Sequence, residues 1–302
     1  MKQSWSIKGS FPPLITPFAD GKVDYKTYAR LVEYQIKNGS HGILVNGTTA
    51  EPSTLTVHER NKLVETAIKS ASGSKPIVAA TGSQSFAETE RLTQHAIEAG
   101  ADALLIVTPY YIRPSQQGMI DYFLKLAELH ELPWMIYHIP GRAAVNVSLD
   151  TLTQLKKSSK NFVGIKHAAN DLGFVSDCLQ ALGTTFRIFV GLEELSFPMM
   201  AVGACGLMNA VGNLKPKELV EMVESVWNND FASAKALHFD LLEINRSVFY
   251  DTNPIPIKYM MRKIGLIPNN EHRLPMIPAS PRLARRLDKV LRCSGMIEET
   301  LP

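Results

Sequence analysis

Lys166 lies within a short apolar stretch, and this setting points to amine chemistry. Residues 161–168 read Asn-Phe-Val-Gly-Ile-Lys-His-Ala, a pattern that predicts a buried strand. Burying an unpaired ammonium is costly, so this position favours the neutral amine, the form that attacks carbonyl groups and makes Schiff bases. The stretch alone leaves one alternative open, a lysine at a strand end whose ammonium reaches water or a carboxylate.

Other reactive side chains follow other predicted strands. The turn 46–51 (Asn-Gly-Thr-Thr-Ala-Glu) contains Thr48, and its small residues suit backbone binding of an anion, although an ordinary turn has the same composition. Tyr111, Tyr137 and Arg142 come after two later strands or at their ends. Hydroxyl groups can relay protons, and a guanidinium can hold a carboxylate with two hydrogen bonds. Together with the lysine, these residues suit carbinolamine and enamine chemistry on a 2-oxo acid. Taken singly, Tyr137 could equally pack in the core and Arg142 could form a surface salt bridge.

The elements that must position these residues alternate regularly. Short stretches that are apolar on both faces predict buried parallel strands at 10–18, 42–46, 76–81, 103–108, 134–139, 162–167, 187–190 and 206–209. Amphipathic stretches between them predict helices at 25–37, 58–70, 87–99, 116–128, 149–157, 172–182, 194–201 and 215–227, with Thr56 and Ser148 as N-caps. This alternation favours an α/β fold of the (β/α)8 TIM-barrel type over residues 1–230. Further helices at 231–247, 256–264 and 281–293 predict a helical C-terminal extension over residues 231–302.

A barrel of this type carries its active site at the C-terminal ends of the strands, where the residues above are expected. Side chains alternate along a strand, so Gly164 and Lys166 should share one face and Ile165 and His167 the other. We expect Gly164 to leave space beneath the lysine. No G-x-G-x-x-G motif follows a predicted strand, which argues against dinucleotide binding.

The composition is that of a soluble globular protein, with 45% hydrophobic and 20% charged residues and a net charge of +3. We expect small-molecule substrates, and no membrane binding because Pro198, Gly203 and Gly206 interrupt the longest weakly apolar stretch. The basic residues near the C-terminus are spaced as a solvated helix face, which argues against nucleic-acid binding. The three cysteines form no Cys-x-x-Cys pair, which argues against a disulfide framework or zinc ribbon and indicates a cytoplasmic setting.

From about residue 9 to about residue 278 the chain resembles the dihydrodipicolinate synthase/N-acetylneuraminate lyase family of class I, Schiff-base-forming pyruvate lyases. The resemblance is carried by four motifs in order, namely Gly47-Thr48-Thr49-x-Glu51, Thr108-Pro109-Tyr110-Tyr111-x-x-Pro114, Tyr137-x-x-Pro140-x-Arg142 and Gly164-Ile165-Lys166. The segments 253–258 (Asn-Pro-Ile-Pro-Ile-Lys) and 273–276 (Arg-Leu-Pro-Met) look more like the synthase branch.

The resemblance implies a catalytic set. Pyruvate would be bound to Lys166 as a Schiff base. Thr48, Tyr111 and Tyr137 would form a proton relay, with Tyr111 reaching into the site of a neighbouring subunit. The family is usually a homotetramer built as a dimer of dimers.

The resemblance also implies substrate contacts. The turn that contains Thr49 would hold the pyruvate carboxylate, and Arg142 the carboxylate of the second substrate. Gly191 and Met208 would line the pocket. No metal or organic cofactor is expected. For the synthase branch the second substrate would be L-aspartate 4-semialdehyde and the product 4-hydroxy-tetrahydrodipicolinate, in lysine biosynthesis.

Two departures from the family pattern leave alternatives open. His138 and His167 stand where the synthases usually have asparagine and glutamate. Because they lie on adjacent strands, we expect the two histidines to be in contact. A metal bound between them would lack an evident third ligand. Glu193 and Glu194 resemble the acidic pair that neuraminate lyases use on sugar hydroxyls. An aldolase or dehydratase for a 2-keto-3-deoxy sugar acid, or a neuraminate-type lyase, is therefore the alternative activity. A catalytically silent ligand-sensing barrel is a remoter alternative, against which the retained catalytic set argues.

The lysine-feedback site of many synthases looks eroded. Pro52, Val57, Arg60 and Gln84 replace small polar, histidine or asparagine residues, whereas Tyr110 and Glu88 remain. We therefore expect no inhibition by millimolar lysine.

Overall fold

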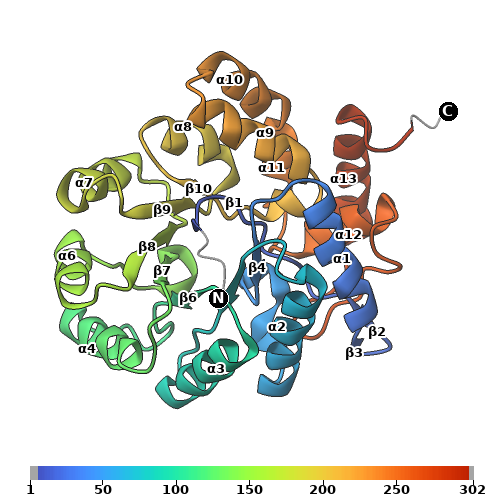
Figure 1. Cartoon of the computed structure of the whole chain (residues 1–302). Coiled ribbons are helices and arrows are strands. Elements are labelled where there is room, and N and C mark those ends of the chain that lie inside the picture. The colour runs from blue at the N-terminus through green and yellow to red at the C-terminus, as the bar shows by residue number, and fades with distance from the viewer. Residues whose placement is uncertain (1–5, 299–302) are drawn as a thin grey trace.

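The computed structural model describes residues 6–298, and its centre is a curled parallel sheet with helices around it (Figure 1). In this part of the chain the sheet has eight strands in the order β1-β10-β9-β8-β7-β6-β5-β4, and every neighbouring pair is parallel. The strands are β1 (Gly9–Ser10), β4 (Ile43–Val45), β5 (Ile77–Ala80), β6 (Ala103–Val107), β7 (Trp134–His138), β8 (Phe162–His167), β9 (Arg187–Val190) and β10 (Gly206–Leu207). The predicted α/β class and eight-strand pattern are confirmed.

Hydrogen bonds also connect the two ends of the strand order. Beyond β1, the Leu14 N–H donates to the Leu44 carbonyl, and the Leu44 N–H donates to the Pro12 carbonyl, each over 3.1 Å. Pro13 and Leu44 form a parallel bridge. The sheet therefore curls back on itself.

The first strand is much shorter than the predicted stretch 10–18. Pro12 and Pro13 lack the N–H groups that a continuous ladder needs, so β1 ends at Ser10. The end of the stretch instead forms a small antiparallel hairpin from β2 (Phe18–Ala19) and β3 (Lys22–Val23), which we did not predict.

The two faces of the strands pack into separate hydrophobic clusters. On β7, Trp134 and Ile136 belong to the large cluster beneath the helices, whereas Met135 and Tyr137 belong to the smaller cluster inside the curled sheet. This alternation is the one expected of strands, and it directs Tyr137 into the enclosed interior.

Apart from α5, which we did not predict, the outer helices lie close to the predicted ranges. They are α1 (Tyr25–Lys37), α2 (Val57–Ala71), α3 (Phe86–Ala99), α4 (Gln116–Ala127), α5 (Pro140–Ala143), α6 (Leu149–Ser158), α7 (Leu172–Leu182), α8 (Ser196–Ala201) and α9 (Pro216–Trp227). Thr56 and Ser148 accept hydrogen bonds from N–H groups in the first turns of α2 and α6, as predicted for N-caps.

The C-terminal segment is helical, as predicted, with α10 (Phe231–Asp240), α11 (Leu242–Ser247), α12 (Ile255–Lys263) and α13 (Pro281–Cys293). Helix α11 contacts η3 (Glu193–Leu195), and α12 contacts η4 (Ala210–Asn213), which are short 3-10 turns after β9 and β10. The extension therefore packs against loops at the C-terminal ends of the strands. Among residues 6–298, no helix has the length and apolar character needed to cross a bilayer.

Candidate active site

A small cavity of about 40 Å³ lies at the C-terminal ends of the strands. Its wall brings together residues from β7 and β8, from the turns after β4, β9 and β10, and from the C-terminal extension. They include the predicted residues Thr48, Thr49, Tyr137, Arg142, Lys166, Gly191 and Met208, together with Glu193 and Asn253. Seven of the eight residues predicted for the site therefore lie around one cavity.

Lys166 is buried on β8, and only 3% of it is exposed. It pairs in register with Tyr137 on β7, and its Nζ lies 4.3 Å from the centre of the Tyr137 ring. An amine over an aromatic face is held by the negative charge of the ring face without an ion pair. Because it is buried, Lys166 does not extend into bulk water, whereas the other form of the alternative, a nearby carboxylate, agrees with the position of Glu193 in the same cavity.

Two glycines beside the lysine have different purposes. A Cβ on Gly164 would lie 1.9 Å from the Arg187 carbonyl oxygen, so this glycine lets β8 and β9 approach. The atoms nearest to that Cβ belong to Arg187 and not to Lys166, so the expected space beneath the lysine stays a prediction. A Cβ on Gly191 would lie 3.0 Å from Lys166 Cε, so Gly191 is the glycine that makes room for the lysine side chain.

Hydroxyl groups of the turn after β4 face the cavity. The Thr48 hydroxyl donates to Tyr137 Oη over 3.3 Å, from η1 (Thr48–Ala50) to β7. The Thr49 hydroxyl accepts a hydrogen bond from Asn253 Nδ2 over 2.9 Å. Because its oxygen is occupied as an acceptor, the Thr49 hydroxyl can donate its own proton to an anion in the cavity.

The C-terminal extension fixes this turn from behind. Glu51 has a left-handed backbone, with a φ of 56°, and its side chain is buried. Its carboxylate contacts Lys258 Nζ at 2.8 Å and His272 Nδ1 at 3.1 Å. Burial lowers the pKa of Lys258, and the attraction of Glu51 opposes that shift. The buried pair therefore ties α12 to the turn that carries Thr48.

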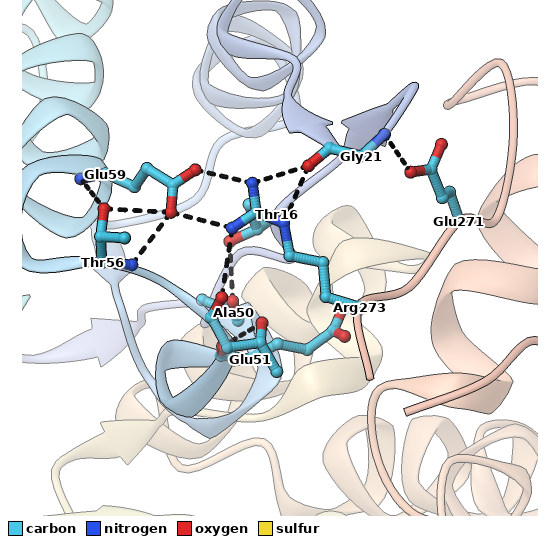
Figure 2. Close-up of polar contacts among 9 residues, drawn as sticks. Thr16, Gly21, Ala50, Glu51, Thr56, Glu59, Glu271 and Arg273 are labelled. Carbon is cyan, nitrogen blue, oxygen red and sulfur yellow. Dashed lines mark hydrogen bonds and ion pairs between the residues drawn. The ribbon is translucent and has the colours of Figure 1, made fainter. Parts of the chain in front are cut away.

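A second anchor lies at the rim of the same turn (Figure 2). Arg273 donates to Glu59 with both Nη atoms, over 2.8 and 2.6 Å, and to the carbonyls of Gly21 and Thr54. The Thr16 hydroxyl donates to the Ala50 carbonyl over 2.7 Å. The turn is thus held from the N-terminal segment, from α2 and from the C-terminal extension.

Glu193 and Glu194 do not form the acidic pair that the sequence suggests. Glu193 is 1% exposed and lines the cavity, and its Oε1 accepts the Ala210 N–H over 2.6 Å. Glu194 lies outside, where it pairs with Arg246 at 2.7 Å. One carboxyl group therefore belongs to the cavity and the other to the protein surface.

A larger cavity of about 610 Å³ shares Thr48, Tyr137 and Arg142 with the small one. Arg142 is exposed on α5, so its guanidinium lies at the boundary between the two spaces. Its position suits capture of an anion that enters from the larger cavity.

Tyr111 is the predicted site residue that the single chain does not bring to the cavity. It is 84% exposed and lies outside both cavities, although the adjacent Tyr110 lines the larger one. Its φ of 75° lies in the left-handed region and is uncommon for a tyrosine.

His138 and His167 are in contact, as predicted. Their Nδ1 atoms lie 3.1 Å apart, and His138 Nε2 lies 3.4 Å from Asn146 Oδ1. The pair sits behind Tyr137 and Lys166, on the opposite face of the same two strands. Burial and, to a smaller extent, the neighbouring His138 together lower the pKa of His167 to about 4.

Sequence reasoning missed Asn253 as a member of the site. It recognised the 253–258 segment as a family motif but had no signal that the amide would contact Thr49, which lies 204 positions away. The same holds for the Glu51–Lys258 pair, whose members are 207 positions apart.

Comparison with known proteins agrees with this geometry. The model of the dihydrodipicolinate synthetase family matches residues 6–293. A relative from Thermus thermophilus, 4-hydroxy-tetrahydrodipicolinate synthase, is 40% identical over 96% of this chain and 97% of its own. The crystal structure of dihydrodipicolinate synthase from Aquifex aeolicus superposes with a TM-score of 0.94 at 37% identity, over 96% of this chain and 99% of that one. The 4-hydroxy-tetrahydrodipicolinate synthase of Methylacidiphilum fumariolicum SolV also gives a TM-score of 0.94, at 36% identity over 96% of each chain.

The resemblance in the motifs therefore extends over nearly the whole sequence and the whole fold. The chain belongs to the dihydrodipicolinate synthetase family.

Proposed function

We propose that the chain is a 4-hydroxy-tetrahydrodipicolinate synthase, which joins pyruvate, held as a Schiff base on Lys166, to L-aspartate 4-semialdehyde. The observation that carries the proposal is a buried lysine amine beside a tyrosine, in a cavity at the C-terminal ends of parallel strands. The names of the similar proteins, at 35–40% identity over nearly their full length, support this choice of reaction.

The first step is attack of the Lys166 amine on the keto carbon of pyruvate. The amine is separated from bulk water in the enclosed site, since only 3% of Lys166 is exposed. Thr49 and the backbone N–H groups of its turn bind the pyruvate carboxylate, which orients the keto carbon toward Nζ. Loss of water gives the iminium, and loss of a methyl proton gives the enamine nucleophile.

Protons move through hydroxyl groups in this scheme. Tyr137 exchanges protons with the adduct, and the Thr48 hydroxyl connects it to the rest of the relay. Tyr111 completes the relay in the site of a neighbouring subunit, which accounts for its exposure in a single chain. Arg142 binds the carboxylate of the aldehyde substrate at the boundary of the larger cavity. The enamine attacks the aldehyde, and the amino group of that substrate then displaces the lysine.

The assembly that this scheme needs is a homo-oligomer, proposed as a tetramer of two tight dimers. We propose that residues 1–230 form a closed (β/α)8 barrel and that residues 231–302 form its helical extension. The contacts from Asn253 and Lys258 to the turn after β4 support a catalytic purpose for the extension.

Borohydride trapping with pyruvate, followed by peptide mass spectrometry, tests the proposal. The expected result is a reduced pyruvyl adduct on Lys166 that is lost in Lys166→Ala, together with turnover of L-aspartate 4-semialdehyde. An adduct without that turnover, but with release of pyruvate from a 2-keto-3-deoxy sugar acid or N-acetylneuraminate, would assign the alternative lyase activity. Absence of any adduct in folded protein would refute the Schiff-base mechanism.

A further inference from the structure

A carboxyl group that the hydroxyl relay does not use lies in the wall of the lysine cavity. Glu193 lines the same 40 Å³ space as Lys166, at the first position of η3 after β9. A space of this size brings its lining groups near any adduct formed on the lysine. Glu193 and Lys166 therefore line the same enclosed space.

The two oxygens of this carboxyl group have different surroundings. Oε1 accepts the Ala210 N–H over 2.6 Å. Oε2 is buried and has no hydrogen-bond partner among residues 6–298. A buried carboxylate oxygen without a partner is costly, whereas a protonated one leaves a donor available to a ligand.

The backbone at Glu193 is rigidly held. The Ser196 hydroxyl donates to the Glu193 carbonyl over 2.7 Å, and Asn245 Nδ2 lies 3.5 Å from the same oxygen. These contacts hold the main chain of Glu193, and the Oε1 contact holds its carboxyl group in the cavity wall, whereas Glu194 pairs with Arg246 outside.

The electrostatic setting favours a proton on this group in the empty site. Burial raises the pKa of Glu193 to about 7, against the opposing effects of backbone hydrogen bonds and of the Lys166 charge. The other polar side chains of the cavity wall are those of Tyr137 from β7, Arg142 from α5, Asn253 from the C-terminal extension and the two threonines of the turn after β4. A positive charge on the lysine nitrogen lowers the pKa of Glu193, against the effect of burial, and so favours the carboxylate.

We propose that Glu193 is a further catalytic residue, which donates the proton that releases water from the carbinolamine on Lys166 and then acts as counter-ion to the iminium. This inference rests on the proposed Schiff-base function. It assigns to a carboxyl group a step that the hydroxyl relay would otherwise have to perform.

The step balances without another reactant. The nitrogen lone pair of the carbinolamine forms the C=N bond while the C–O bond breaks. The departing hydroxyl takes its bonding pair and the Glu193 proton and leaves as water. A neutral acid and a neutral carbinolamine thus become a carboxylate and an iminium cation, which attract each other in a buried site.

The test is the rate at which pyruvate forms the borohydride-trapped adduct, measured by intact mass after quenching at set times between pH 5.5 and 8.5. Glu193→Gln keeps the shape and can still accept the Ala210 N–H, but it cannot transfer a proton or carry a negative charge. We expect adduct formation to slow by about 10²-fold, in line with general acid catalysis. The wild type should also lose rate above neutral pH as the acid form disappears, and Glu193→Gln should lack this alkaline limb.

Glu194→Gln is the matched control, because Glu194 is the next residue, is about half exposed and pairs with Arg246. It should form the adduct at the wild-type rate with the wild-type pH profile. A Glu193→Gln rate within about threefold of wild type, with the alkaline limb retained, would overturn the inference and leave the Schiff-base function intact. Absence of an adduct in the wild type would overturn both.

Infrared difference spectroscopy of the wild type is a second test, and it does not require that any variant folds. At pH 6, saturation with pyruvate should remove one protonated-carboxyl band as the iminium forms. A full adduct that leaves the protonated-carboxyl region unchanged would contradict the inference. If Glu193→Gln folds, it should lack the band change.

Discussion

The hydroxyl groups of Thr48 and Tyr137 lie 3.3 Å apart across the site, although the residues are 89 positions apart in the chain. Thr48 comes from the turn after β4, and Tyr137 from β7, so two strands (β5 and β6) separate their elements in the sheet. The contact therefore exists only because the sheet is curled. A relay through these two oxygens depends on the fold as a whole, and it gives the first of five tests.

Thr48→Val removes the hydroxyl at nearly constant volume. Because the relay through Tyr137 would be broken, we expect kcat to fall by about 10²-fold, the usual size of a general acid–base contribution. Thr48→Ser keeps the hydroxyl and should stay within about threefold of wild type. Steady-state kinetics on both variants would check this, and a nearly normal kcat for Thr48→Val would mean that the contact only packs.

Tyr111→Phe should lose about 10²-fold in kcat if the exposed Tyr111 hydroxyl shuttles protons in a neighbouring subunit. Mixing Tyr111→Phe chains with Lys166→Ala chains should then restore activity, because some mixed sites combine an intact lysine with an intact tyrosine. The measurement is activity before and after subunit exchange. If the mixture gains nothing although exchange is complete, Tyr111 does not serve a neighbouring site.

Glu59→Gln should destabilise the fold by about 1–3 kcal/mol at neutral pH, because it weakens a two-point hydrogen bond to the Arg273 guanidinium. Hydrogen bonding from Arg273 lowers the pKa of Glu59 from 4.5 to about 2. A lowered carboxyl pKa gives stability that is present above pH 4.5 and is lost as the pH falls toward 2. Urea unfolding of both proteins should show the difference shrinking over this range.

Glu65→Gln, on the same helix but in an exposed pair with Lys62, is the control for Glu59→Gln. It should change the free energy of unfolding by less than about 1 kcal/mol. Equal effects of the two substitutions would show that the Arg273 contact carries no special stability.

Because of the buried His167, the free energy of unfolding should depend on pH in the acid range. Its pKa is lowered from 6.5 to about 4, so the unfolded chain binds a proton in this range before the folded chain does. The free energy of unfolding should therefore fall as the pH drops from 6.5 toward 4, with a contribution on the order of 3 kcal/mol from this group. His167→Asn should flatten that dependence, whereas His58→Asn, at an exposed position, should not. Parallel slopes for His167→Asn and the wild type would contradict the prediction.

Lysine should not inhibit the enzyme at millimolar concentrations. Arg60 occupies the wall of the larger cavity, where its Nη2 donates to the carbonyls of Ala80 and Gly82 over 3.2 Å and its Nη1 lies 3.6 Å from Glu88. A buried cation in that place opposes a cationic ligand. Half-inhibition below about 1 mM in a steady-state assay, a binding free energy near 4 kcal/mol, would show that the site still functions.

Much of the fold could be predicted because its signals are local. The strands are apolar on both faces, so β4 to β10 were recognised from short windows of sequence. The predicted strand 10–18 is too long. The prediction followed the hydrophobic pattern and did not account for the missing N–H groups of Pro12 and Pro13. The predicted helix 231–247 is divided at Leu241 into α10 and α11.

The candidate site could be predicted where strand alternation decides which face a residue takes. Lys166 and Tyr137 follow from this rule, and so does the contact of His138 with His167. Alternation could not show that Glu193 turns inward and Glu194 outward, because both lie in a turn after the strand. Nor could it show that Asn253 reaches Thr49, which depends on how the extension docks.

That docking has a consequence for anyone who engineers this enzyme. The charges of Glu51 and Lys258 are matched only while α12 is in place, and removing one member of a buried ion pair typically costs about 3–5 kcal/mol. A chain cut after α9 would expose an unmatched carboxylate directly behind the turn that carries Thr48 and Thr49. Chimeras should therefore exchange the stretch 253–273 and the turn 48–51 together, although the two segments lie far apart in the sequence.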